Sequence, residues 1–256
     1  MKKCIFLSPV ILVCLALYVS NVAGQKKQIL FDFRQPQTSA TAKIATQTQK
    51  LVLSKVFRKY LTDENKCNQN FAGDGRNDFL QAARNAGQIV PSIVDSAEGS
   101  FTARNKQETL YVISVGECNA SHADNYGSKR VAIFAGQQLI ADLDVNFLSN
   151  VVRTTDLDGD GVNELLMTTG DMAQGTLIEM ASLLDFASGK LRAIEDFGTV
   201  VEDSCASLMA GSSSKASVIT LTGGAPGKFP QIRVENYEGG CRKTKRWRFV
   251  SSGKMQ

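Results

Sequence analysis

The sequence has little of the chemistry that most catalytic centres use. Its one histidine, His122, lies in a polar stretch, where we expect a loop residue rather than half of a catalytic dyad with Asp124. No serine stands in the GxSxG pattern of an esterase nucleophile. No two of the six cysteines have the CxxC spacing of a redox motif or a zinc ribbon. The sequence therefore predicts a protein that is not an enzyme.

A large charge of one sign is also missing. The formal net charge is +4, and it falls to +2 when the first 24 residues, which hold Lys2 and Lys3 and no acidic residue, are removed. A chain this close to neutral is not expected to bind nucleic acid or an anionic membrane as its main partner. No segment beyond the N-terminus is apolar enough for a membrane span in the mature chain. We expect the partner to be an extracellular protein or a glycan whose identity stays open.

The N-terminus has the pattern of a signal peptide over residues 1–24. Lys2 and Lys3 provide the positive start, residues 5–19 are almost all apolar, and Val22-Ala23-Gly24 places small residues before a cleavage site. The apolar run is shorter than the roughly 20 residues that span a bilayer, which argues against the alternative of an uncleaved anchor. The sequence predicts a protein that is secreted or resides in the periplasm or cell envelope.

Four cysteines remain after residues 1–24: Cys67, Cys118, Cys205 and Cys241. An even number in an oxidising compartment predicts two disulfide bonds. Four cysteines allow three pairings, and we favour the pairing that is local in sequence, Cys67–Cys118 with Cys205–Cys241.

The pattern divides the mature chain into two parts. Residues 25–65 form a flexible lead-in, rich in Gln, Thr, Ala and Lys, and then an amphipathic helix from about Thr46 to near Asp63. Residues 66–256 form a disulfide-bonded β domain, with one further short helix over residues 78–86. One or two N-terminal helices are therefore expected.

The β domain is predicted from the change to a period of two after about Gln88. Strands that follow one another without intervening helices predict a mainly β protein with antiparallel sheets, either a sandwich or a partial propeller. The expected strands are residues 110–115, 130–134, 139–144, 150–155, 164–169, 176–186, 190–197, 217–221, 231–237 and 246–250.

One loop carries the clearest chemical signal. Asp156, Asp158 and Asp160 alternate along it, so their carboxylates can converge on one ion, and oxygen ligands are those that Ca²⁺ prefers. Gly161 permits the sharp turn that such a loop needs. The carbonyl of Val162 and the carboxylate of Glu164 complete the predicted ligand set.

The loop lacks two features of an EF-hand. Position 12 is Met167 instead of glutamate, and the flanking segments are strand-like. Over residues 150–170 it resembles the DxDxDGxxD/E loop of the FG-GAP repeats in integrin-α-like propellers. That resemblance implies calcium held by the four acids and a blade strand beginning at Glu164. Phe197-Gly198 and Gly224-Ala225-Pro226 echo the name of the family, but both follow the loop instead of preceding it.

The sequence leaves several alternatives open. Asn70 to Asp78 partly repeat the acidic pattern and are a possible second metal site, although a helix-capping loop fits them as well. Asp156-Leu157-Asp158-Gly159 resembles the nucleophile motif of haloacid-dehalogenase-type phosphatases, which would make the protein a secreted metal-dependent hydrolase; Asp160 departs from that motif. An accessory or inhibitor protein is a further alternative. The function that we expect is a secreted, non-catalytic calcium-binding module with a binding or structural role.

Overall fold

A computed structural model describes residues 27–35, 44–57, 92–114, 129–207, 211–241 and 246–254. The predicted signal peptide, the second helix, Cys67, Cys118, His122 and the possible second metal site at Asn70–Asp78 lie outside these residues.

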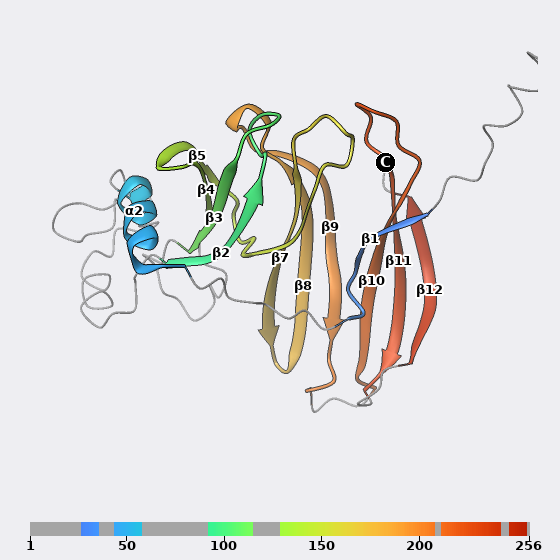
Figure 1. Ribbon diagram of the computed structural model, residues 1–256. Helices are drawn as coiled ribbons and strands as arrows, with labels where there is room; N and C mark the ends of the chain where they lie inside the picture. Colours follow the sequence, from blue (N-terminus) through green and yellow to red (C-terminus); the bar gives the residue numbers. More distant parts are fainter. Residues whose placement is uncertain are drawn as a thin grey trace, which may run out of the picture.

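The described part is mainly β, as predicted, with one α-helix and antiparallel sheets (Figure 1). One sheet has the strand order β2-β3-β4-β5, and the other has the order β12-β11-β10-β9-β8-β7-β6, with β1 added to β10. The elements are β1 Gln28–Asp32, α2 Thr46–Phe57, β2 Ser92–Gly99, β3 Glu108–Ser114, β4 Lys129–Ala135, β5 Gln138–Asp144, β6 Asn150–Thr155, β7 Glu164–Ala173, β8 Thr176–Asp185, β9 Arg192–Asp203, β10 Ser213–Thr222, β11 Gln231–Gly240 and β12 Trp247–Lys254.

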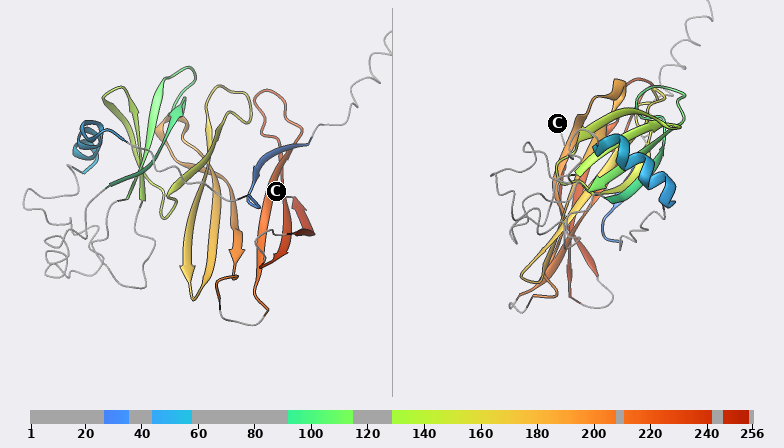
Figure 2. Two further views of the ribbon diagram at one scale, coloured as in Figure 1. Left: turned by 60° about the horizontal axis from the view of Figure 1, so that its bottom comes forward. Right: turned by 90° about the vertical axis from the view of Figure 1, so that its left-hand side faces the viewer.

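The larger sheet consists of two four-stranded parts. Strands β9 and β10 pair over only three residue pairs, from Ser214↔Asp203 to Ala216↔Val201. Beyond that ladder β10 pairs instead with β1. The chain therefore forms three four-stranded antiparallel groups, β2–β5, β6–β9 and β1 with β10–β12, which Figure 2 shows in succession along the molecule.

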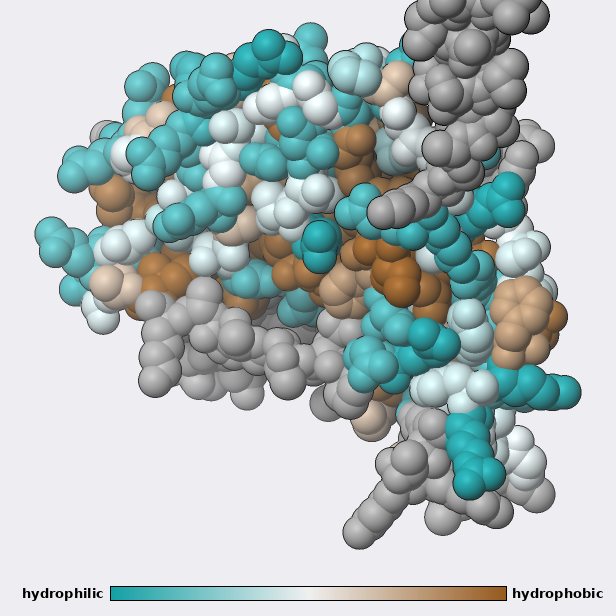
Figure 3. All heavy atoms as spheres, turned by 45° about the vertical axis from the view of Figure 1, so that its right-hand side comes forward, coloured by the Kyte–Doolittle hydropathy of each residue, from teal (hydrophilic) through white to brown (hydrophobic). Residues whose placement is uncertain are grey.

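Apolar side chains fill the spaces on both sides of the middle group. Leu165 and Met167 of β7 belong to the core that faces β2–β5, whereas Leu166 belongs to the core that faces β1 and β10. Alternate residues of a strand point to opposite faces, so burial on both faces produces a continuous apolar run. In the view of Figure 3, hydrophilic side chains cover much of the surface and apolar atoms are visible in a band across its middle.

Helix α2 covers the outer face of the group β2–β5 (Figures 1 and 2). Val52 and Val56, one helical turn apart, are buried against Ile113, Ala132 and Phe134. The predicted start of the helix at Thr46 is confirmed. The part of the prediction beyond Phe57 lies outside the described residues. No helix in the described part of the chain is long and apolar enough to cross a membrane.

All ten predicted strands are present, but two strands were missed. Gln28–Asp32 form β1 in a stretch that we expected to be loosely ordered, and Ser92–Gly99 form β2. Strand β1 is short, and it is a strand because β10 offers its backbone groups there, beyond the short ladder with β9, and because Leu30 enters the core. Propensity in isolation does not reveal such a partner.

The predicted disulfide bond between Cys205 and Cys241 is confirmed. It joins the turn after β9 to the end of β11, which is the end of the sheet where β9 and β10 pair. The bond therefore ties together the two four-stranded parts of the larger sheet where their hydrogen bonding is shortest.

Candidate metal centre

The acidic loop, residues 156–163, connects β6 to β7 in the middle group. The two strands are paired up to Thr155↔Glu164, so the eight residues between them form a closed loop at the end of a ladder. This placement, between adjacent antiparallel strands, agrees with the strand-like flanks expected from the sequence.

The structure brings the three aspartates together. Asp156, Asp158 and Asp160 each offer a carboxylate oxygen, and these oxygens lie within 4.8 Å of one another. Within the described residues, these carboxylates accept hydrogen bonds from backbone N–H groups of the same loop; Asp156, for instance, accepts from Gly159 at 2.7 Å and Gly161 at 3.0 Å. The turns are thus held by the acids themselves, through Asx-type bonds. Gly159 and Gly161 have positive φ values of 74° and 89°, which glycine adopts without strain.

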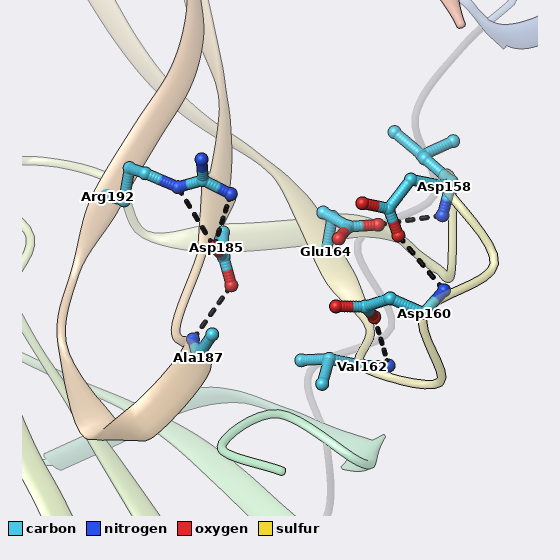
Figure 4. A network of polar contacts seen from close by, with 8 residues as sticks. Asp158, Asp160, Val162, Glu164, Asp185, Ala187 and Arg192 are labelled. Carbon is cyan, nitrogen blue, oxygen red and sulfur yellow. Dashed lines mark hydrogen bonds and ion pairs between the residues drawn. The ribbon is translucent and has the colours of Figure 1, made fainter. Parts of the chain in front are cut away.

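Glu164 begins β7 and lies at the base of the loop, where its side chain points toward that of Asp158 (Figure 4). It is only 2% exposed, and one carboxylate oxygen accepts the N–H of Leu157 at 2.7 Å. Burial raises the pKa of Glu164 to about 7, the Leu157 hydrogen bond opposes this, and the negative charges of Asp158 and Asp185 add to it. Its carboxylate is not among the three that lie within 4.8 Å of one another. Val162, 7% exposed, donates its N–H to Asp160 at 2.7 Å.

Two other loops hold the acidic loop from outside. On one side, Ser100 and Asn163 exchange two hydrogen bonds of 2.7 and 2.8 Å, and Arg104 Nε donates to the carbonyl of Asp160 at 2.6 Å. On the other side, the N–H of Gly227 donates to the carbonyl of Asp158 at 2.6 Å. Three of these four bonds reach the acidic loop through its backbone and one through the Asn163 side chain, so none of them uses the carboxylates of the three aspartates.

A separate ion pair lies beside Glu164. Asp185, 5% exposed, accepts the guanidinium of Arg192 at 2.7 Å and the N–H of Ala187 at 2.7 Å (Figure 4). Because Arg192 already compensates Asp185, the pair is not a source of ligands for the acidic loop. The Asp185–Arg192 pair forms part of the surroundings of Glu164.

The donor set fits a hard divalent cation. All the side-chain groups are carboxylates, and Ca²⁺ takes six to eight oxygen ligands from carboxylates, carbonyls and waters. Asp156, Asp158 and Asp160 would hold the ion, with Glu164 and the Val162 carbonyl as the remaining protein ligands predicted from the sequence. Such an ion would neutralise the charge that gathers in the loop.

Sequence reasoning found the acids but missed the residues that hold the loop in place. Arg104, Ser100 and Gly227 are 56 or more positions away from their partners, and no local pattern marks them. The segment Gly224-Ala225-Pro226, which we noted only as an echo of a family name, belongs to the loop that contacts Asp158. Comparison with protein families, curated proteins and solved structures finds no match for the chain.

Proposed function

We propose that this protein is an exported, non-catalytic calcium-binding module in which Ca²⁺ stabilises the connection between β6 and β7. The observation that carries the proposal is the convergence of three carboxylates whose hydrogen-bond partners, among the described residues, are backbone N–H groups and not cationic side chains.

The energetics favour a cation there. Like charges 4.8 Å apart repel by roughly 1 to 4 kcal/mol per pair, depending on the effective dielectric constant. A divalent cation converts this repulsion into attraction. Calcium at 100 times its Kd would stabilise the folded chain by about 3 kcal/mol. Extracellular calcium is millimolar, so even a weak loop would be occupied there.

The FG-GAP resemblance is consistent with the position of the loop, which joins consecutive antiparallel strands of a four-stranded group. By contrast, the phosphatase-like alternative needs a parallel α/β sheet, and every strand pairing in the described part is antiparallel. We therefore favour a calcium-binding module over a metal-dependent hydrolase. An accessory or inhibitory role is compatible with a calcium-binding module, because a protein with such a role also acts by binding another protein.

The test is calorimetric titration of calcium into residues 25–256 after chelation, together with the melting temperature. We expect one ion per chain and a rise in melting temperature of several degrees. The variant Asp158→Ala/Asp160→Ala is expected to lose both effects.

A matched control removes two acids elsewhere. Asp144 and Asp196 also cap turns by accepting a backbone N–H, at 2.7 and 3.0 Å, but lie outside the cluster. Asp144→Ala/Asp196→Ala should bind calcium as the parent chain does. If the parent chain binds no calcium at millimolar concentration, the proposal is wrong and the loop is an acidic turn. Magnesium-dependent phosphatase activity would favour the alternative.

A further inference from the structure

Three hairpin loops of the chain have the same length. Eight residues separate β2 from β3, β6 from β7, and β10 from β11. Each loop joins the first two strands of a consecutive run of antiparallel strands. The three loops are residues 100–107, 156–163 and 223–230, and the first residue after each is Glu108, Glu164 and Gln231.

The first two loops share an internal hydrogen bond. Glu108 accepts the N–H of Phe101, and Glu164 accepts the N–H of Leu157, at 2.8 and 2.7 Å. In both cases the glutamate lies seven positions after the donor, and both glutamates are 2% exposed. Counting from the first loop residue, the glutamate side chain at the ninth position thus binds the backbone N–H of the second residue in each loop.

Corresponding side chains of the two loops also pack against corresponding cores. Phe101 belongs to the core between the first and second groups, and Leu157 packs against the core between the second and third groups. Leu110 and Leu166, each two residues after the glutamate, also belong to the first and the second of these cores, respectively. At the sixth position both loops have a positive φ, 59° at Asn105 and 89° at Gly161. Equal length, the shared hydrogen bond, the burial of the glutamate and a positive φ at the sixth position are what a repeated unit produces. At the fourth position the loops differ, since Gly159 has a positive φ and Ala103 does not.

The loops differ where the aspartates stand. The positions of Asp156, Asp158 and Asp160 are occupied in the first loop by Ser100, Thr102 and Arg104. Glu108 compensates by binding more donors than Glu164 does, since it also accepts the N–H of Thr102 at 2.8 Å and the hydroxyl of Thr102. Arg104 extends to the neighbouring loop and donates to the carbonyl of its counterpart, Asp160, at 2.6 Å.

We propose that residues 92–114 and 150–173 are copies of one strand–loop–strand unit, and that residues 100–107 are a cation loop whose ligand positions have been replaced, with Arg104 in the place of Asp160. The guanidinium of Arg104 then bridges the two loops in place of a metal ion, so the first loop keeps its shape without one. The third loop shares the length alone. The assignment of residues 100–107 as a former cation loop rests on the proposed function, whereas the relationship between the two strand–loop–strand units does not.

The test restores the aspartates in the first loop. The variant Ser100→Asp/Thr102→Asp/Arg104→Asp is expected to bind two calcium ions per chain where the parent chain binds one. The control is Ala103→Asp/Lys106→Asp/Gln107→Asp, which makes the same change in net charge in the same loop at positions whose counterparts, Gly159, Val162 and Asn163, supply no side-chain ligand. We expect it to bind one ion. If the first variant folds and binds one ion, the inference is overturned.

A reciprocal variant decides the outcome if the first one does not fold or if the parent chain binds no calcium. Asp156→Ser/Asp158→Thr gives the acidic loop two residues of its counterpart. Interchangeable loops predict that its metal-free melting temperature equals or exceeds that of the parent chain, because repulsion is removed. A melting temperature clearly below that of the parent chain would overturn the inference whether or not calcium binds. Absence of calcium binding to the parent chain alone would refute the proposed function and the assignment of residues 100–107 as a former cation loop, but not the repeat.

Discussion

Replacing Glu164 by glutamine should change the pH dependence of the metal-free protein's stability. Glu164 is 2% exposed, and its pKa rises from the ordinary value of 4.5 to about 7 because the charged form is buried. A folded-state pKa above the unfolded value means that the folded chain holds its proton more tightly. The contribution of Glu164 to stability is therefore highest below about pH 4.5, falls as the pH rises to about 7, and is then constant.

The magnitude follows from the size of the shift. A rise from 4.5 to about 7 corresponds to about 3 kcal/mol against the ionised form. Glutamine has no charge to bury and keeps an oxygen that can accept the Leu157 N–H. In the presence of chelator, we expect Glu164→Gln to be more stable than the parent chain at pH 8 by about 2 to 3 kcal/mol, which is roughly 5–10 °C in melting temperature. At pH 4.5 the two proteins should be alike.

The assay is thermal unfolding at a series of pH values in chelator, followed by the same series in calcium. Calcium should reverse the order at pH 8, since the ion favours the charged carboxylate. Glu108→Gln is the control. Glu108 is equally buried but accepts two backbone N–H groups and a hydroxyl, so its replacement should cost about 1 to 3 kcal/mol through lost hydrogen bonds. Equal pH profiles for Glu164→Gln and the parent chain, both metal-free, would refute the reasoning.

Three further predictions concern the framework. The Cys205–Cys241 bond closes a separation of 36 residues, so Cys205→Ser/Cys241→Ser should lose about 4 kcal/mol by the chain-entropy relation, measured by denaturant unfolding, and an unchanged midpoint would contradict this. Arg130 and Asp142 form an ion pair of 2.6 Å with side chains 9% and 11% exposed. Asp142→Ala should therefore cost about 3 to 5 kcal/mol, while Arg130→Met/Asp142→Leu should restore most of it, and equal losses in both variants would argue against the pair. Val56, on the buried face of α2, is 1% exposed, so Val56→Ala should cost about 2 kcal/mol and loosen the helix in hydrogen exchange, whereas a cost near zero would place the helix off the sheet.

Much of the secondary structure could be predicted because its signals are local. The continuous apolar run at the start of β7, the turn residues between strands and the helical spacing of Val52 and Val56 are all readable within a window of ten residues. Strands β1 and β2 escaped prediction for the opposite reason. Of the five side chains of β1, only that of Leu30 is fully buried, and β2 has no fully buried side chain. Both strands are therefore stabilised mainly by pairing with their partner strands, which a local pattern does not reveal.

The candidate site shows the same division. Its aspartates lie within five positions of one another, and their alternation with glycine predicts a loop that gathers carboxylates. The environment of Glu164 could not be read in this way. Glu164 becomes buried only when the sheets pack, and that burial is the main reason why its pKa is raised; the charge of Asp185, at the end of β8, adds to it.

By itself, then, the sequence determined the class of fold, most of the strands, the Cys205–Cys241 pairing as the favoured local choice, and the acids that converge in one loop. These follow from short-range periodicity and spacing. The tertiary structure alone decided that β1 joins β10, that the larger sheet divides at its short β9–β10 ladder, and that Arg104 and Gly227 hold the acidic loop from either side. Those features are contacts between residues far apart in the chain, where backbone groups find partners only after the sheets have packed.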